Sequence, residues 1–549
     1  MSETTKDAGG LSFSSPVGRW VLLATVLGSG VAFLDATVVN VALPSIGRDF
    51  GVGLADLQWT VTGYTLTLSA FLLLGGALGD RYGRRRLFVI GLVWFAVASL
   101  VCGLAPSAPL LIVARAIQGI GGALLTPGSL AIIEASFRPD DRGRAIGAWS
   151  GLGGVFGAIG PLLGGVLVTL VTWRLVFLIN LPLAALAVWV ARRHVPESSK
   201  GGEQGPLDIQ GPVLAVLGLG GVTYSLIEGP ARGWTSPATL AVIGAGGLLL
   251  IGFLVNEARA RDPLLPLSIF RSRIFAGANE ATFAIYAALG TVTFLGVLQL
   301  QQVLHYSALS AGLALLPLTL ILLALSSRSG KLATQIGPRI PMTVGPLVAA
   351  VGMALFARVV PGASYASSVL PAAIVLGLGM TLTVPALTTT ALGAVDSERA
   401  GVASAVNNDV ARFAALAAVA IIPALAGIST AGSAINTAAF SSGYRVAMFI
   451  SAGLCASAGL ISFVTIRGPR RACAPATGFS CPLVGPPAED PGWTARRLRL
   501  ATAGPADELE GMAGPGGQLE GMAGPGGQLE GMAGPAVAGE GVDGGDESD

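Results

Sequence analysis

The sequence predicts an all-α integral membrane protein with fourteen transmembrane helices, and three observations support this prediction. Of its 549 residues, 52% are hydrophobic and only 12% are charged, whereas about a quarter of an average soluble domain is charged. Apolar stretches of about 20 residues, the length that crosses a bilayer as a helix, recur along most of the chain. Basic residues gather in every second loop between these stretches. Together these features exclude a soluble globular fold.

The apolar stretches divide the chain into fourteen segments. The first six lie at about 18–43, 57–79, 86–105, 108–134, 144–170 and 173–191. Two more lie at about 210–229 and 236–256, and the last six at about 274–300, 309–327, 341–360, 366–392, 400–428 and 444–466. Because the first segment is longer than the apolar part of a signal peptide, we expect it to remain as a membrane helix.

The charges of the loops predict the orientation of these helices. One set of loops is rich in Arg and Lys and includes the segments 81–86, 138–144, 192–200, 259–273, 328–339 and 467–471. The opposite loops hold only Arg48, Arg174, Arg232, Arg358 and Arg445. Basic loops remain in the cytoplasm. We therefore expect a multi-pass protein of the cell (inner) membrane with both termini in the cytoplasm, which requires an even number of helices.

A short internal repeat predicts two related halves. Gly76, Leu78, Gly83 and Arg85 follow the second segment, and Gly330, Leu332, Gly337 and Arg339 follow the tenth at the same spacing. Transporters built from repeated helical units carry such internal similarity. The predicted parts are a cytoplasmic N-terminal segment (1–17), an N-terminal six-helix half (18–191), a linker with two inserted helices (192–256), a C-terminal six-helix half (257–467) and a cytoplasmic tail (468–549).

The tail has a different composition from the rest of the chain. A ten-residue repeat, Leu-Glu-Gly-Met-Ala-Gly-Pro-Gly-Gly-Gln, begins at Leu509 and Leu519 and returns truncated at Leu529. Such a Gly-, Pro- and Glu-rich segment buries too little apolar surface to offset the entropy of ordering, so we expect disorder. Its role as a dispensable solvated tail or as a partner-binding segment stays open.

The loop after the second segment resembles the signature loop of the major facilitator superfamily, Gly-x-Leu-x-Asp-Arg-x-Gly-Arg-Arg/Lys. The matching residues that we assign to a cytoplasmic gating loop are Gly76, Asp80, Arg81, Gly83, Arg84 and Arg85. In that family the loop acts as a latch that favours one of two access states. A role in topology alone would explain the arginines but not Asp80 and the glycines.

Three further segments narrow the resemblance to one branch of that superfamily. Leu34–Pro44, Arg115–Gly122 and Gly153–Gly165 are similar to the first-, fourth- and fifth-helix motifs of the fourteen-helix, EmrB/QacA-type drug/proton antiporters. The resemblance covers about residues 18–467. It implies a major facilitator fold with two six-helix halves plus two inserted helices. In this branch the arginine is linked to proton coupling, and the motif implies that role for Arg115.

Asp35 is the second candidate for proton coupling. It lies well inside an apolar helix, where a charged carboxylate is costly unless it is hydrated, paired or protonated. A carboxyl group in such a place can load and release a proton, or it can serve as a structural hydrogen-bonding group. Arg115 always stays charged and must meet an acceptor inside the protein.

Small residues in the fifth segment form a stripe at helical spacing. The residues of this antiporter motif are Gly157, Gly160, Pro161, Gly164 and Gly165. Such a stripe permits close packing against another helix, and the proline favours a bend. The stripe would therefore serve either as a pivot for motion or as plain helix packing.

Other buried polar positions are secondary candidates. They are Glu280, Asn408, Asp409 and Arg412. Asp409 and Arg412 are three residues apart and could pair on one helix face. Cys102 and Cys455 fall in apolar helices and are interpreted as small hydrophobic residues. No metal-binding spacing occurs and no cofactor is expected.

The resemblance implies a proton-coupled antiporter that exports small lipophilic or cationic drugs across the cytoplasmic membrane. We expect it to act as a monomer in the lipid bilayer on small-molecule substrates and protons, without nucleic acid. The alternative is a dedicated exporter of one metabolite, such as an antibiotic or siderophore. A membrane enzyme would need a catalytic constellation, and an ATP-driven pump would need a phosphate-binding Gly-Lys-Ser/Thr loop; neither occurs in the sequence. A receptor would be expected to carry a folded soluble signalling domain.

Overall fold

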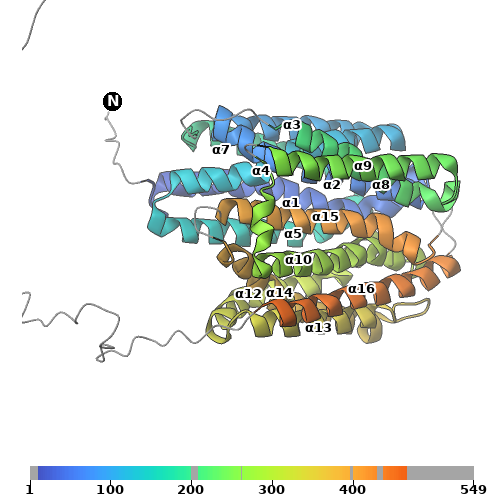
Figure 1. Ribbon diagram of the computed structural model, residues 1–549. Helices are drawn as coiled ribbons and strands as arrows, with labels where there is room; N and C mark the ends of the chain where they lie inside the picture. Colours follow the sequence, from blue (N-terminus) through green and yellow to red (C-terminus); the bar gives the residue numbers. More distant parts are fainter. Residues whose placement is uncertain (1–9, 200–207, 261–262, 396–399, 429–436, 467–549) are drawn as a thin grey trace, which may run out of the picture. The chain divides into compact units, whose positions relative to one another are not determined.

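The computed structural model describes residues 10–199, 208–260, 263–395, 400–428 and 437–466 (Figure 1). Within these ranges every regular element is helical, apart from an isolated bridge between Leu11 and Phe137. Fourteen of the helical segments are long and apolar enough to cross a membrane. This confirms the predicted all-α membrane fold and its number of helices. The predicted tail at 468–549 lies outside the described residues.

The N-terminal six spans use seven helices. Their bounds are α1 (Pro16–Phe50), α2 (Leu54–Tyr82), α3 (Arg84–Leu104), α4 (Ala108–Ser136), α5 (Pro139–Leu170), α6 (Leu175–Leu178) and α7 (Asn180–His194). The sixth span comprises both α6 and α7. The inserted pair consists of α8 (Gln210–Arg232) and α9 (Pro237–Arg259).

The C-terminal spans contain several local changes of helix type. Their elements are η1 (Leu267–Arg271), α10 (Arg273–Thr291), η2 (Val292–Gly296), η3 (Gln299–Val303), α11 (Ala308–Ala314), α12 (Leu316–Ile336), α13 (Arg339–Phe356), η4 (Tyr365–Val369), α14 (Leu370–Gly393), α15 (Ala400–Leu425) and α16 (Thr437–Thr465). The elements η2, η3 and η4 are π-helical turns within long spans.

Most spans extend several residues past the apolar stretches that predicted them, because polar caps and turns complete their ends. The Ser15 hydroxyl accepts a hydrogen bond from the backbone N–H of Gly18 at 3.0 Å and begins α1. Gly51, at φ 63°, ends the same helix in the left-handed conformation. Neither polar end contributes to the hydropathy signal.

Each half forms a bundle through close helix pairs. In the first half α1 packs against α5 and α4 against both α2 and α3, and in the second half α13 packs against α14 and α16. The α8–α9 hairpin contacts α2 of the first half and α8 also contacts α15 of the second half (Figure 1). The inserted hairpin therefore lies where the two halves meet. The boundaries of the predicted parts remain a prediction.

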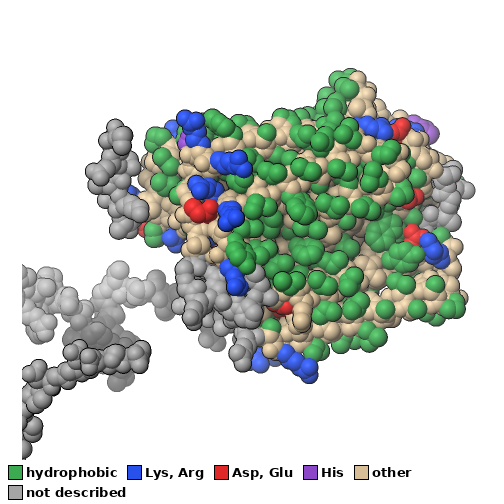
Figure 2. All heavy atoms as spheres, turned by 90° about the horizontal axis from the view of Figure 1, so that it is seen from above, with side chains coloured by type: hydrophobic (Ala, Val, Ile, Leu, Met, Phe, Trp, Pro, Cys, Tyr) green, Lys and Arg blue, Asp and Glu red, His purple; other side chains and the backbone are tan. Residues whose placement is uncertain are grey.

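Hydrophobic side chains cover the outside of the helices. Figure 2 shows them across most of the visible face, with Lys and Arg gathered toward its ends. Large exposed apolar residues include Val97, Leu104, Leu248, Leu460 and Val464. An apolar surface of this extent is unfavourable in water and suits a surrounding of lipid chains.

The two halves are joined at the end of the bundle where α1 ends and α2 begins. Gln58 Nε2 on α2 donates a hydrogen bond to the carbonyl of Val419 on α15 at 2.7 Å. Gln301 Nε2 donates to the carbonyl of Val41 on α1 at 2.9 Å. One hydrophobic core runs through both halves at this level and contains Leu43 and Leu295. This end of the bundle is closed by direct contacts between the halves.

Candidate functional site

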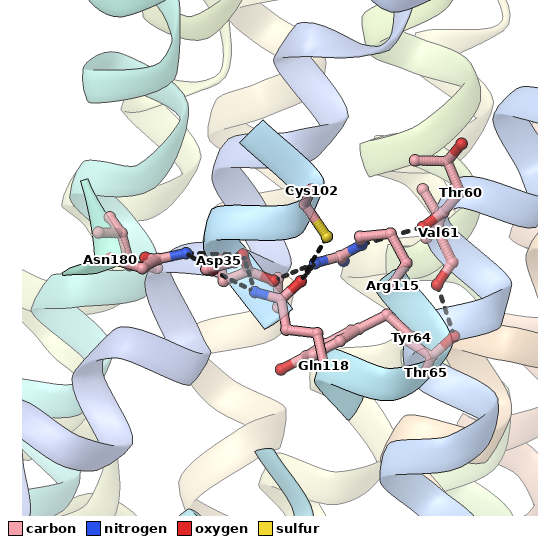
Figure 3. A network of polar contacts seen from close by, with 12 residues as sticks. Asp35, Thr60, Val61, Tyr64, Thr65, Cys102, Arg115, Gln118 and Asn180 are labelled. Atoms are coloured by element: carbon pink, nitrogen blue, oxygen red, sulfur yellow. Dashed lines mark hydrogen bonds and ion pairs between the residues drawn. The ribbon is translucent and has the colours of Figure 1, made fainter. Parts of the chain in front are cut away.

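The two residues selected for proton coupling meet in the middle of the N-terminal half (Figure 3). Asp35 on α1 and Arg115 on α4 are 0% and 1% exposed. The Arg115 Nη1 atom donates to Asp35 Oδ2 at 2.5 Å. Because both charges are removed from water, each one depends on the other for compensation.

Two amide side chains hold the other oxygen of the carboxylate. Gln118 Nε2 donates to Asp35 Oδ1 at 3.0 Å, and Asn180 Nδ2 donates to the same atom at 2.9 Å. The Ser99 hydroxyl oxygen accepts a second hydrogen bond from each amide, at 2.7 and 3.0 Å. The Asp35 carboxylate thus accepts three hydrogen bonds, and α1, α3, α4 and α7 supply the side chains.

Arg115 is held on its remaining sides by acceptors and an aromatic ring. Its Nη1 atom also donates to Gln118 Oε1 at 2.6 Å, and its Nε atom donates to the Thr60 carbonyl of α2 at 3.1 Å. Its guanidinium carbon lies 4.2 Å from the centre of the Tyr64 ring, a cation–π geometry. The site therefore fixes a cation and an anion in the buried interior of the helix bundle (Figure 3).

Sequence reasoning did not assign roles to Gln118, Ser99, Asn180 or Tyr64. Gln118 could have been found, because it lies three residues after Arg115 and shares its helix face. Asn180 is a polar residue in an apolar segment, which is also a signal. Ser99 and Tyr64 carry no such signal, since serine and tyrosine are common in membrane helices and only tertiary packing brings them to the site.

The thiol of Cys102 lies at the edge of the same network. This cysteine of α3 is fully buried, and its Sγ atom donates to Gln118 Oε1 at 3.6 Å. Cys455 on α16 is also buried and unbridged. Both occupy apolar helices, as the sequence predicted.

The candidate gating loop forms the tight connection between α2 and α3. Gly83 has a φ of 105°, a conformation that other residues rarely adopt. Asp80 pairs with Arg84, with 2.8 Å between Oδ1 and Nη2. Gly76 lies within α2 opposite Pro127 of α4, and Arg81 lies against the Tyr82 ring.

Glu197, which sequence reasoning missed, binds the beginning of α3. Its carboxylate accepts hydrogen bonds from the backbone N–H groups of Arg85 at 3.0 Å and Arg86 at 3.2 Å. The Arg85 guanidinium donates to the carbonyl of Val195 at 3.1 Å. A carboxylate at a helix N-terminus is stabilised by the helix dipole and by the free N–H groups. The loop is therefore tied to the segment that follows α7.

The small-residue stripe of α5 packs against both halves of the protein. A Cβ atom at Gly164 would lie 2.8 Å from Val38 Cγ2 of α1. One at Gly165 would lie 2.6 Å from the Cα of Leu309 in α11. Gly160 faces α1 as well, and the carbonyl region of Pro161 faces Gly312 of α11. Gly157 differs, because a Cβ atom there would meet nothing within 4 Å.

The secondary candidates do not form one site. Glu280 is exposed on α10, and Asn408 is exposed on α15 and donates to its own helix at Ser404. Among the described residues Asp409 and Arg412 form no ion pair; instead Arg412 Nη2 donates to Thr126 Oγ1 of α4 at 3.4 Å. The buried contact of this region belongs to the adjacent Asn407, which donates to side chains of α10.

The sequence matches a known protein family and several of its characterised members. The family model of the Major Facilitator Superfamily matches residues 25–420. The chain is 36% identical over 386 residues to the multidrug resistance protein Stp of Mycobacterium tuberculosis (strain CDC 1551 / Oshkosh), covering 70% of this chain and 71% of that protein. It is 36% identical over 420 residues to the methylenomycin A resistance protein of Bacillus subtilis (strain 168), covering 76% and 89%. It is 34% identical over 464 residues to the puromycin resistance protein pur8 of Streptomyces alboniger, covering 82% and 91%.

Solved structures show a similar fold at low sequence identity. A bacterial homologue of the human lysosomal transporter Spinster superposes with a TM-score of 0.59 at 18% identity, covering 82% of this chain and 97% of that chain. The xylose transporter XylE from E. coli superposes with a TM-score of 0.56 at 16% identity, covering 83% and 98%. At this identity the similarity describes the arrangement of helices alone.

Proposed function

This chain belongs to the major facilitator superfamily and is a multi-pass membrane transporter, and from this premise we propose that it is a proton-coupled antiporter. It exports small lipophilic or cationic drugs across the cytoplasmic membrane in exchange for protons. The relatives support the export of drugs, since they are named for multidrug, methylenomycin A and puromycin resistance. The observation that carries proton coupling is the fully buried pair of Asp35 and Arg115.

Proton uptake at Asp35 would change the contacts of several helices at once. When the carboxylate gains a proton, its charge is lost and the attraction to Arg115 weakens, while Arg115 keeps Gln118 Oε1 and the Thr60 carbonyl as acceptors. Protonation therefore loosens the contact of α1 with α4, which keeps the hydrogen bond from Gln118 to Asp35 Oδ1, without leaving the cation bare. Because α1 also packs against the stripe of α5, this loosening is transmitted to the helix that contacts the second half.

The remaining parts of the site take roles around this exchange. The loop from Gly76 to Arg85, with Asp80, Arg81 and Glu197, holds the cytoplasmic ends of α2 and α3 together. The α5 stripe acts as the pivot between the halves, and the closed end with Gln58 and Gln301 faces outward. Both termini are cytoplasmic, and one chain acts as a monomer because it contains both halves and the complete proton site.

A second candidate is a dedicated exporter of one metabolite. It is favoured by relatives named for single antibiotics, including methylenomycin A, puromycin and tetracenomycin C. The two candidates share the proton site and differ in the breadth of the substrate pocket. Competition between chemically unrelated lipophilic cations would favour a multidrug exporter, and its absence a dedicated one.

The test uses the purified protein in liposomes with an imposed pH gradient and a fluorescent lipophilic cation. We expect gradient-driven movement by the wild type and by Asp49→Asn, and none by Asp35→Asn. Asp49 is a matched control, because it lies on the same helix but pairs with Arg174 at an exposed position. Movement by Asp35→Asn at the wild-type rate, with the variant folded by size-exclusion chromatography, would contradict the assignment of Asp35.

A further inference from the structure

A groove of about 400 Å³ lies between the beginnings of α1 and α5, on the predicted cytoplasmic side. Its floor is apolar and is formed by Leu22, Leu23 and Val26 of α1 and by Leu152 of α5. Leu23 is 38% exposed and Leu152 is 46% exposed. The groove is therefore open to the surface of the bundle.

This groove faces away from the second half of the protein. A Cβ atom at Gly154 of α5 would lie 4.0 Å from Leu323 of α12, so that face of α5 is directed toward the second half. Leu152 is two residues earlier, and residues two apart on an α-helix point about 160° apart. Leu152 thus points to the outside of the bundle, where an apolar side chain meets lipid.

Two arginines form the cytoplasmic rim of the groove. Arg19 lies near the beginning of α1 and Arg144 near the beginning of α5, and both line the groove. Val26 and Leu152 follow these arginines along their helices. At a rise of 1.5 Å per residue, the charges lie roughly 10 Å above the deepest apolar residues. The groove is therefore cationic at the membrane surface and apolar below it.

The segment before α1 holds Arg144 in place. The guanidinium carbon of Arg144 lies 4.7 Å from the centre of the Phe13 ring, and the Phe13 N–H donates to Asp141 Oδ2 at 3.0 Å. Arg144 Nη1 lies 3.6 Å from Asp141 Oδ1, but the Arg144 side chain is 68% exposed, so most of its five N–H donors stay available. Arg19 has no carboxylate within 4.0 Å in the described part of the chain. Arg19 is therefore the less compensated of the two charges.

A cationic rim above an apolar floor defines the chemistry of the occupant. Arginine binds phosphate oxygens through paired N–H donors, but a free phosphate ion would leave the apolar floor without a partner. A peptide would bring backbone polar groups that leucine and valine side chains cannot satisfy. A phospholipid with a net negative charge fits both parts, because its phosphate meets the rim and an acyl chain follows the floor. The choline group of a zwitterionic lipid would instead bring a positive charge near the arginines.

We propose that this groove binds an anionic phospholipid of the predicted cytoplasmic leaflet, with Arg19 as the principal phosphate contact and Arg144 as the second. The site goes beyond the proposed export function and does not depend on it, because it requires only the membrane fold and its orientation. It gives the segment before α1 a role, since Phe13 positions Arg144. A lipid held here bridges α1, which carries Asp35, and α5, which carries the small-residue stripe.

Photo-crosslinking of the full-length protein in phosphatidylcholine liposomes tests this site. The probe is a small fraction of phosphatidylglycerol with a diazirine on one acyl chain, and mass spectrometry locates the labelled residues. Labelling of the groove is divided by labelling of α9, whose exposed Leu248 and Ile251 report on the average bilayer. We expect this ratio to fall at least about fivefold when Arg19→Gln and Arg144→Gln are combined, since each arginine near an anionic membrane surface strengthens binding about fivefold. Arg193→Gln is the matched control, because it removes a cytoplasmic arginine of α7 that does not line the groove, and the ratio should stay unchanged.

A second variant tests the apolar floor with both arginines in place. Leu152→Trp fills the groove from α5 and should also lower the ratio, in protein that elutes as the wild type does from size-exclusion chromatography. A ratio unchanged in both the double arginine variant and Leu152→Trp would overturn the site.

Two further arms identify the occupant. A phosphatidylcholine probe with the same diazirine should give a lower ratio than phosphatidylglycerol; equal ratios would overturn the requirement for an anionic lipid. Millimolar inorganic phosphate, compared with sodium chloride at the same ionic strength, should leave the phosphatidylglycerol ratio unchanged. Displacement by phosphate would assign the rim to the free ion and overturn the lipid as its occupant.

Discussion

The two halves of the molecule hold polar groups in different ways. In the N-terminal half the central contact is ionic, with Asp35 and Arg115 sealed by amides. In the C-terminal half the central contact is neutral, with Asn407 donating to Asn279 and Thr282. The loops repeat this difference: the first contains the ion pair of Asp80 and Arg84, whereas Arg339 in the second donates to a backbone carbonyl at Phe463.

This difference shows that similar helical architecture does not require similar electrostatics. A neutral polar contact is satisfied at any degree of protonation within the physiological range, whereas a buried carboxylate changes its contacts when it gains a proton. Under the proposed function, the ionic contact of Asp35 and Arg115 is therefore the contact that responds to protons. The following predictions test whether the two halves differ as described.

Removing one member of the ionic contact should have the largest effect on stability. Arg115→Ala leaves the Asp35 charge buried and uncompensated, which typically costs about 3–5 kcal/mol. Asn407→Ala in the C-terminal half breaks only neutral hydrogen bonds and should cost about 1 kcal/mol. Thermal unfolding in detergent measures both variants. Equal losses of stability in the two variants would show that the ionic contact contributes no more to stability than the neutral one.

Closely packed glycines should tolerate larger side chains equally poorly in both halves. The two halves would then differ in their charged contacts and not in their packing. Gly164→Leu meets Val38, and Gly379→Leu meets the Cα of Ala349 at 2.7 Å from its Cβ position. Overpacking of this kind costs about 1–3 kcal/mol. Gly157→Leu is the control, because its surroundings are open. Unfolding temperatures that fall for only one of the two buried glycines would break the expected equivalence.

The smallest effect is expected at the gating loop. Glu197→Gln keeps an acceptor near the N-terminus of α3 but removes the charge, a loss of about 0.3–1 kcal/mol. Local opening of α3 should increase, and hydrogen exchange of the first-turn amides at Arg85 and Arg86 measures it. Protection unchanged from the wild type would mean that the loop is held without the Glu197 charge.

Much of the fold could be predicted from the sequence because hydropathy reports directly on lipid contact. The number of helices followed from it, but the break between α6 and α7 did not, since the mean hydropathy of the segment from 175 to 194 stays high across the break. The division of the tenth span at Leu315 also left little trace beyond Pro317. Most helix ends were predicted a few residues short, because caps are polar and lie outside the apolar stretch, whereas the ends of α13 and α15 were predicted too far along the chain.

Only some residues of the candidate site could be predicted from the sequence, and a physical reason distinguishes them from the others. Asp35 and Arg115 stood out because an ionisable group inside an apolar segment needs compensation. The spacing of Asp409 and Arg412 permitted a pair, but the described structure directs Arg412 to Thr126 on another helix. Glu197 and Glu257 lie close to helix ends. From the sequence alone, a carboxylate at such a position is expected to be exposed to water. Only the packing of segments distant in the chain reveals that they are held or enclosed.

The buried thiol beside Gln118 can report when the N-terminal half opens to solvent. Cys102 can react with a small thiol reagent only while the N-terminal half admits solvent, and Cys455 gives the same reading for the C-terminal half. The ratio of the two alkylation rates, followed by peptide mass, would time the opening of each half without an added label. If the different charges of the two halves affect how often each half opens, the two alkylation rates will differ.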